Sequence, residues 1–209
     1  MKVAQLWRYS VKSLRGESLE SVDVLADGLR GDRSTQVVDH KGARMTGRTA
    51  KRLLGLQSGL DSNGEPTIDG HVWQSTEALD RIREAAGPGA DLAPLGRHFD
   101  DRSILVTTDG AIRALGVDGR RLRPNVFIEG VEGLAEAEWV GRRLVLGDVE
   151  IEVADRCERC VMTTIDPDSL EVDPDVLRRI NEKFGKLMGV LCEVVTPGEL
   201  RIGDEARLI

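Results

Sequence analysis

The most informative stretch of this chain is RCERCVMTTIDPD, residues 156–168. It places two cysteines, Cys157 and Cys160, among arginines and directly before a run rich in β-branched residues. Nearby positive charge stabilises the ionised form of a thiol. Because the thiolate is the form that attacks electrophiles and binds soft metals, the stretch predicts a reactive or metal-binding cysteine.

Three other interpretations of the two cysteines compete with this one. A structural zinc site needs about four ligands, and the remaining candidates stand singly in the sequence: His40, His71, His98 and Cys192. A thioredoxin-type redox pair opens a helix after a strand, whereas the β-branched residues after Cys160 predict that it sits at or just before a strand. Two ordinary small core residues remain an open alternative.

Composition restricts the class of protein. With 209 residues, 40% apolar and 31% charged, the chain is typical of a soluble globular protein with a sizeable core. Its net charge of −7 argues against a general nucleic-acid binder but is compatible with a local basic pocket. No apolar run reaches the length of about 18 residues that a membrane span needs, and the start MKVAQLWR lacks a signal-peptide core. Three cysteines make a poor disulfide framework, so we expect a cytoplasmic protein.

The pattern of the chain predicts a mainly β protein with peripheral helices (α+β). Short strands are expected at 3–6, 19–25, 35–38, 104–106, 125–128, 190–195, 200–202 and 206–209. Gly147-Asp148 predicts the turn of a hairpin over 143–153. Helices are expected at 49–56, 76–86, 110–115 and 174–186, with Ser75 or Thr76 capping the second and Asp173 the last. The stretch 87–89 predicts a linker, followed by a loop to about residue 101.

Two basic turns in the first 35 residues are candidate anion sites, and each has a structural alternative. Lys12 and Ser13 place an ammonium and a hydroxyl beside a turn, which suits an anion but also a solvated loop. Arg33, at the end of GLRGDR (28–33), can hold a phosphate bidentately or pair with Asp32.

Two further candidates lie at the ends of predicted strands. In LRPNV (122–126), the proline restricts the backbone and directs Arg123 outward, although a structural turn with Asn125 fits as well. In Thr107-Thr108-Asp109, a strand runs into a helix start that can hold an anion or only cap the helix. Each signal is weak alone, and their order along the chain makes them specific.

Read together, four motifs resemble the MOSC family, the C-terminal domain type of molybdenum cofactor sulfurases, and most of all its branch with the mitochondrial amidoxime-reducing component and bacterial relatives. The motifs are WRYSVKSLRG (7–16), GLRGDR (28–33), LRPNV (122–126) and RCVMTTIDPD (159–168). The resemblance covers most of the chain, while residues 59–101 match poorly and form a shorter middle. It implies an N-terminal β-barrel domain over residues 1–90 and a MOSC β-barrel domain over residues 91–209, which meet at a basic cleft.

The resemblance also implies that a pterin dithiolene and Cys160 together hold molybdenum. A soft thiolate suits such a metal, and Arg156 and Arg159 would help to keep Cys160 ionised. The implied cofactor-binding residues are Lys12, Ser13, Arg33 and Arg123 at the phosphate and pterin, Thr107, Thr108, Asp109 and Asn125 at the pterin edge, and Arg159 and Thr163 in the cysteine motif. Two features depart from the family pattern: Gly110 replaces an expected small polar residue, and Cys157 has no assigned role.

The activity that the resemblance implies is reduction of small N-hydroxylated or N-oxygenated compounds by a molybdenum oxidoreductase. The chain shows no haem or flavin motif and no four-cysteine iron–sulfur pattern, so we expect a separate electron-transfer protein as partner. One alternative is a carrier of the cofactor or of sulfur, with a persulfide on Cys160 or Cys157. In that case the pyridoxal-phosphate-dependent sulfurase of the family would be another polypeptide. A degenerate MOSC fold without cofactor is the second alternative.

Overall fold

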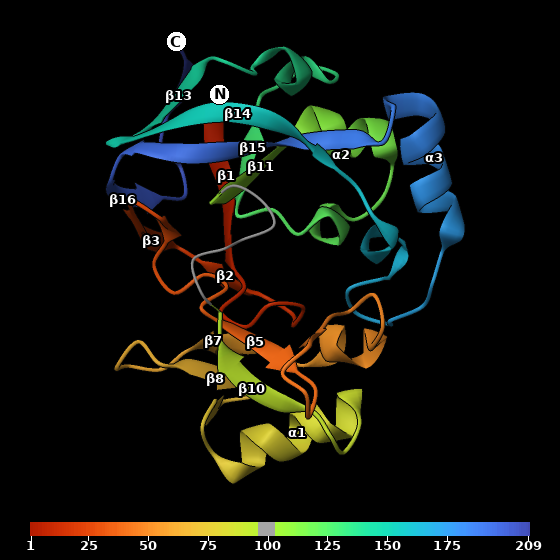
Figure 1. Ribbon diagram of the computed structural model, residues 1–209. Coiled ribbons are helices and arrows are strands. Elements are labelled where there is room, and N and C mark those ends of the chain that lie inside the picture. The colour runs from red at the N-terminus through yellow and green to blue at the C-terminus, as the bar shows by residue number, and fades with distance from the viewer. Residues whose placement is uncertain (96–102) are drawn as a thin grey trace.

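The largest element of the protein is an eight-stranded sheet. The computed structural model describes residues 1–95 and 103–209, and Figure 1 shows this sheet in the upper part of the molecule. Its strand order is β17-β13-β14-β15-β11-β12-β1-β2. The strands are β1 (Lys2–Arg8), β2 (Glu17–Leu19), β11 (Ile104–Thr108), β12 (Val126–Glu129), β13 (Arg143–Leu146), β14 (Val149–Glu158), β15 (Leu187–Thr196) and β17 (Ala206–Leu208). The mainly β architecture expected from the sequence is confirmed.

The predicted hairpin over 143–153 is present as β13 and β14, which pair from Arg143↔Glu152 to Leu146↔Val149. Most pairs in the large sheet are antiparallel, but β11 and β12 run parallel. They are joined through α2 (Asp109–Leu115), because a parallel connection needs a crossover. The buried core over this sheet is mainly aliphatic and includes Val3, Leu6, Val106, Ile128, Ile151 and Val190.

Figure 1 shows a second β-rich part below the large sheet, and its buried side chains form a small core of their own. Two three-stranded sheets build it: β10-β5-β6 and β7-β8-β9. Their bounds are β5 (Thr35–Val38), β6 (Arg44–Met45), β7 (Ser58–Leu60), β8 (Pro66–Ile68), β9 (His71–Val72) and β10 (Asp91–Pro94). Helix α1 (Thr76–Ala86) packs its apolar face on them through Ala78 and Ile82. The predicted 76–86 helix is confirmed, including its cap: the Ser75 side chain accepts a hydrogen bond from the Ala78 N–H.

Strand pairing crosses the expected boundary between residues 90 and 91 in three of the described sheets. Strands β1 and β2 complete the large sheet, and β10 pairs with β5. A third small sheet joins β3 (Ser21–Leu25) and β4 (Gly28–Leu29) to β16 (Gly198–Arg201) from the other end of the chain. The part with the large sheet therefore takes strands from both ends of the chain, whereas the strands of the lower part all lie between residues 35 and 94.

Three local expectations need correction. The loop expected after residue 89 contains β10 at its start, and residues 96–101 of that loop lie outside the described part of the chain. The helix expected at 49–56 is a short 3₁₀ helix, Lys51–Gly55. Helix α3 (Pro174–Phe184) begins after its Asp173 cap as expected but ends two residues earlier, at a left-handed Gly185.

The strand expected at Cys160 is also wrong, because Val161–Thr164 forms the 3₁₀ helix η4. The Thr163 hydroxyl donates to the Cys160 carbonyl at 2.9 Å, and the Thr164 hydroxyl donates to the Val161 carbonyl at 2.7 Å. Such local side-chain bonds stabilise a tight turn and compete with strand pairing. Within the described residues, no helix combines the length and apolar character that crossing a membrane requires.

Candidate functional site

Residues from distant segments line one cavity of about 210 Å³, which we name the cysteine cavity. They come from the turns near residues 12 and 33, from the entry to β12, and from the stretch after β14. Most of the site residues expected from the sequence are among them: Lys12, Ser13, Arg33, Arg123, Asn125, Arg159, Cys160 and Thr163. The cysteine cavity therefore brings cationic groups and a thiol to one place.

Cys160 lies between the end of β14 and the start of η4. Its backbone is extended, with φ −124°, and its carbonyl is held by the Thr163 hydroxyl. The residue is partly exposed, and its side chain contributes to the wall of the cysteine cavity. This local geometry leaves a thiol on a fixed turn with access to a ligand.

The neighbouring thiol, Cys157, is held differently. It is 7% exposed, and the Arg159 guanidinium donates to its sulfur at 2.9 Å. Arg159 also donates to the Leu122 carbonyl, while its buried Nε has no partner in the part of the chain that the structure describes. Arg156 donates to the Leu187 carbonyl at 3.3 Å. The arginine contact seen in the structure is therefore with Cys157, whereas the sequence expectation directed both arginines toward Cys160.

Backbone strain is concentrated around the cysteine cavity. Ser13, Arg33 and Arg123 have φ values of 73°, 49° and 54°, and they are three of the six described non-glycine residues with positive φ. A left-handed conformation costs a non-glycine residue about 1–3 kcal/mol, and such residues persist where the surrounding structure fixes them. Here the Arg33 N–H donates to the Tyr9 carbonyl at 2.8 Å, and the Lys12 N–H donates to the Thr35 carbonyl at 2.8 Å.

Two arginines of the cavity share the ring of Tyr9. The guanidinium carbons of Arg123 and Arg33 lie 4.2 and 5.0 Å from the ring centroid, which is within the range of a cation–π contact. Arg33 also forms a close ion pair with Asp32. Burial raises the pKa of Tyr9 to about 12. Burial, with Arg33 nearby, lowers the pKa of Arg123 to about 10, which leaves Arg123 charged at neutral pH.

Asn125 lines the cysteine cavity, but its amide is used inside the protein. Its Oδ1 accepts hydrogen bonds from the Leu105 N–H at 3.1 Å and from Arg33 Nη1 at 3.2 Å. Its Nδ2 donates to the Trp7 carbonyl at 3.3 Å. Asn125 thus joins β1, β11 and the Arg33 turn. Its side chain bonds to these distant segments, whereas the structural alternative considered for it was a local turn.

The structure does not bring Thr107, Thr108 and Asp109 to the cysteine cavity. The Thr108 hydroxyl accepts from the Ala111 N–H and donates to Glu136 at 2.9 Å. Asp109 accepts the Gly130 and Val131 N–H groups at 3.1 and 3.0 Å. These side chains cap α2 and fix the following loop, so the expectation that they contact a pterin edge is not supported by their positions. The Thr107 hydroxyl is buried without a partner.

A second and larger cavity, of about 630 Å³, adjoins the first. Arg121, Arg123 and Met162 line both, so the two cavities share a wall. Apart from Arg123, the residues of this larger cavity were not predicted as site residues, although Trp7 and Arg15 lie inside the first motif and Arg121 lies one residue before the third. Sequence spacing alone gave no sign that these side chains converge.

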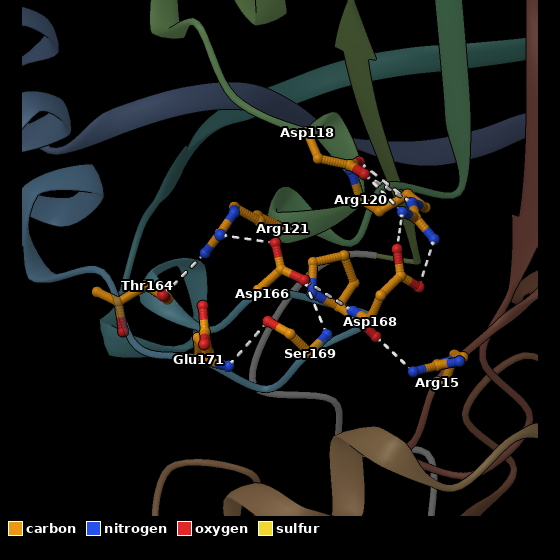
Figure 2. A network of polar contacts seen from close by, with 10 residues as sticks. Arg15, Asp118, Arg120, Arg121, Thr164, Asp166, Asp168, Ser169 and Glu171 are labelled. Carbon is orange, nitrogen blue, oxygen red and sulfur yellow. Dashed lines mark hydrogen bonds and ion pairs between the residues drawn. The ribbon is translucent and has the colours of Figure 1, made fainter.

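The loop after η4 is tied to the wall that the two cavities share. Arg121 donates to the Thr164 carbonyl at 2.8 Å and to the Asp166 carboxylate at 2.9 Å. Arg15, from the N-terminal motif, donates to the Pro167 carbonyl at 2.6 Å. Figure 2 shows these arginines converging on the loop from different segments. The contacts hold the chain after Cys160 in place from both sides.

The fold and the site define a class of mainly β protein. Its two β-rich parts lie around a cationic cavity that contains a cysteine. Residues 100–207 match the family model of the MOSC domain, and residues 1–77 match that of the MOSC N-terminal beta barrel domain. The chain belongs to the MOSC domain family.

Curated relatives cover nearly the whole chain. It is 25% identical to human "Mitochondrial amidoxime reducing component 2", over 97% of this chain and 82% of that protein. It is 24% identical to human "Mitochondrial amidoxime-reducing component 1", over 99% and 82%. A stretch covering 31% of this chain and 8% of the relative is 38% identical to the "Molybdenum cofactor sulfurase" of Bombyx mori. Among solved structures, the YUAD protein from Bacillus subtilis has the same fold, with a TM-score of 0.56 and 14% identity over 99% of this chain and 94% of that chain.

Proposed function

We propose that this protein binds molybdenum cofactor in the cysteine cavity, with Cys160 as a metal ligand, and reduces small N-hydroxylated compounds. The observation that carries the proposal is the convergence of Cys160 with Lys12, Arg33 and Arg123 on one cavity. These residues stand at four separate places in the sequence, and only the fold unites them. Relatives named amidoxime-reducing components and a relative named molybdenum cofactor sulfurase support the same assignment.

The donor set of the cavity fits an anionic, sulfur-rich cofactor. A thiolate is a soft ligand and suits a metal that is otherwise held by dithiolene sulfurs. Arg and Lys side chains form the strong charge-assisted bonds that a phosphate requires. The Arg159 Nε is a buried donor without a partner, and a buried unsatisfied donor at a cavity wall is a site where a ligand can complete the hydrogen bonding.

Each of these residues would have a distinct task. Cys160, fixed by the Thr163 hydroxyl, would tune the metal as a constant ligand and not act as a nucleophile. Arg123 would hold a fixed positive charge at the cavity wall, because it lies against the Tyr9 ring. Lys12 and Ser13 would bind the phosphate or pterin from the opposite segment. When bound, the cofactor supplies a metal that changes oxidation state during removal of oxygen from the substrate.

The electrons would come from a separate electron-transfer protein. Three cysteines cannot provide the four thiolates of a common iron–sulfur cluster, and two of the three are buried. The substrate would be a small molecule and not a nucleic acid, given the net charge of −7. A cytoplasmic location remains a prediction, while the names of the curated relatives place those proteins in mitochondria.

The first test is the content of molybdenum and pterin in protein expressed in a host that makes the cofactor. We expect near-stoichiometric metal in the wild type, loss of metal in Cys160→Ser, and retention in Cys157→Ser as the matched control. With a chemical reductant, the loaded wild type should reduce benzamidoxime. Loss of metal only in Cys157→Ser would show that the other thiol is the ligand.

The same experiment separates the alternatives. Bound cofactor without turnover, together with a sulfur adduct on a cysteine by mass spectrometry, would indicate a carrier. Absence of both metal and pterin, even after incubation with free cofactor, would contradict the proposal and indicate a degenerate fold.

A further inference from the structure

The larger cavity, which we name the arginine chamber, has an apolar body. At about 630 Å³ it is within the size range of small-molecule sites. Its apolar lining comes from both β-rich parts: Trp7, Tyr9, Leu54, Leu60, Met162 and Ile165. Met162 stands two residues after Cys160 and lines both cavities. A flat apolar molecule in the chamber would therefore lie next to the wall that separates it from the cysteine cavity.

The charged lining of the chamber is unbalanced. Four arginines face it, namely Arg15, Arg120, Arg121 and Arg123, against the single acidic residue Glu17 in the described wall. Glu17 is neutralised by Arg8, at 2.7 Å. Positive charge without a matching acid raises the local concentration of anions and disfavours cations.

Two of the four arginines are already neutralised by carboxylates. Arg120 binds Asp118 and Asp168, each at 2.6 Å. Arg121 binds Asp166 at 2.9 Å. Figure 2 shows both arginines turned toward these acids. Their charges therefore stabilise the loop and contribute little to selection of a ligand.

The other two arginines, Arg15 and Arg123, can interact through their positive charge with a ligand in the chamber. Arg123 lies on the Tyr9 ring, which leaves its positive charge uncompensated by a direct carboxylate partner among the described residues. Arg15 donates through Nη2 to the Pro167 carbonyl at 2.6 Å, and its buried Nε has no partner among residues 1–95 and 103–209. Asp168 forms its ion pair with Arg120 and interacts with Arg15 only through a longer-range electrostatic attraction. An arginine that lines an apolar-walled cavity without a carboxylate ion pair among the described residues is complementary to an anionic group on a flat apolar molecule.

We propose that the arginine chamber is the substrate chamber and that it selects N-hydroxylated compounds bearing a flat apolar body and an anionic group, with Arg15 as a specificity-determining residue. This inference rests on the proposed reductase function and adds its substrate class. Neutral compounds of the same shape bind more weakly, and cationic ones bind least.

The test uses three benzamidoximes that differ in charge at the para position: 4-carboxybenzamidoxime, benzamidoxime and 4-(aminomethyl)benzamidoxime. Affinity is measured by calorimetry on the oxidised, cofactor-loaded protein without reductant, so that no turnover occurs. We expect affinity to fall in the order carboxylate, neutral, ammonium. Arg15→Gln should weaken the carboxylate ligand by about tenfold or more while leaving the neutral one little changed. Arg15→Lys should retain most of the preference.

A second pair of variants avoids the structural contact of Arg15. Ser18 is exposed, lines the chamber and lies opposite Trp7 in the β1–β2 pair. Ser18→Glu should weaken binding of 4-carboxybenzamidoxime about two- to fivefold, and Ser18→Lys should strengthen it by a similar factor, the size expected for exposed charge pairs. The opposite signs at one position distinguish electrostatic selection from a general disturbance of the fold.

The outcomes also separate this inference from the proposed function. Equal affinity for the three ligands, or Ser18 variants without effect, would overturn the substrate assignment even if benzamidoxime is reduced. Charge-ordered binding sensitive to Arg15 and Ser18, but without reduction of any ligand, would support the chamber and defeat the reductase proposal.

Discussion

At the scale of single residues, Asn125 shows how a residue at a cavity wall can serve the fold. It is fully buried, and its amide bonds to the backbone of two neighbouring strands and to Arg33. From the sequence, Asn125 could contact a ligand or support a structural turn, and an asparagine suits both roles. Only the partner atoms separate them, because an amide satisfied by the protein has little capacity left for a ligand.

We therefore expect Asn125→Ala to destabilise the protein by about 1–3 kcal/mol, since the Leu105 N–H would lose its acceptor inside the core. Asn125→Asp, which keeps an acceptor for Leu105 and Arg33, should cost less. Urea denaturation at neutral pH measures both free energies of unfolding. Equal stability of Asn125→Ala and wild type would show that the amide faces a ligand and not the strands.

Gly110 explains a departure of the sequence from its family pattern. A Cβ at this position would clash with the Gly133 carbonyl oxygen and lie 2.6 Å from the Val131 carbonyl oxygen. Both are backbone atoms of the loop that Asp109 holds by hydrogen bonds. The small polar residue expected here cannot be accommodated unless this loop moves.

Gly110→Ala should consequently destabilise the protein by about 1–3 kcal/mol, although alanine favours a helix by up to about 1 kcal/mol over glycine. The clash dominates because backbone atoms cannot rotate away. Ala114→Ser, at an exposed position of the same helix, is the control and should change stability little. Thermal unfolding followed by circular dichroism decides the matter, and a stabilised Gly110→Ala would refute the close approach.

At the scale of elements, the sequence succeeded where the structure depends on local signals. Helix α1 was predicted because a cap, a helical spacing and a glycine stop lie within a dozen residues. Strand β10 was missed because its partner β5 lies about 50 residues earlier, and an isolated four-residue strand has no local signature. The 3₁₀ helix η4 was missed because β-branched residues predict strands, while threonine hydroxyls can also bond locally.

The same distinction applies to the site. Short motifs predicted Cys160, Lys12, Arg33 and Arg123 as site residues, because each motif carries its own charge pattern, and the structure places all four at one cavity. The stretch 107–109 was assigned to a ligand because a helix start can bind an anion or be capped, and sequence does not separate the two. Arg15 was overlooked as a site residue because its position in the chamber depends on Pro167, more than 150 residues away.

The loop after η4 gives a prediction about pH. Asp166 accepts the Ser169 and Asp168 N–H groups, both at 3.0 Å, and an ion pair with Arg121. These bonds, led by that from Ser169, lower the pKa of Asp166. Because the folded state binds the proton less well, the carboxylate stabilises the fold above the ordinary aspartate pKa of about 4. That contribution is lost as the pH falls through the lower value in the folded protein.

The stability difference between wild type and Asp166→Asn should therefore be largest at neutral pH and shrink toward pH values below about 4. Urea midpoints of both proteins at several pH values measure it. Glu182→Gln, which removes a carboxylate from an exposed position of α3, is the control. A difference that stays constant from neutral to acid pH would mean that the charge of Asp166 does not support the loop.

At the scale of the whole molecule, both cavities form where residues of the two β-rich parts come together. Strand β1 lies between β12 and β2 in the large sheet, and the segment that follows it carries Lys12 and Arg15 toward the residues after Cys160. Neither part holds a complete set of cavity residues. The strands β1 and β2 thus tie the segment with Lys12 and Arg15 to the large sheet that leads to Cys160.

The last prediction follows from the contribution of the N-terminal strands β1 and β2 to the large sheet. A fragment of residues 91–209 would lose β1 and β2, so the edge of β12 would be left unpaired and open to aggregation. It would also lose Val3 and Leu6 from the core they share with Ile128, and β3, the partner of β16. We expect this fragment to be unfolded or aggregated by circular dichroism and size-exclusion chromatography, and to bind no cofactor. Co-expression of residues 1–95 with residues 96–209 is the control: both halves of every strand pair are present, so a soluble complex should form despite the break. A monomeric, cooperatively melting 91–209 fragment would show instead that the C-terminal part is an independent domain, and the two cavities would then have to form by docking.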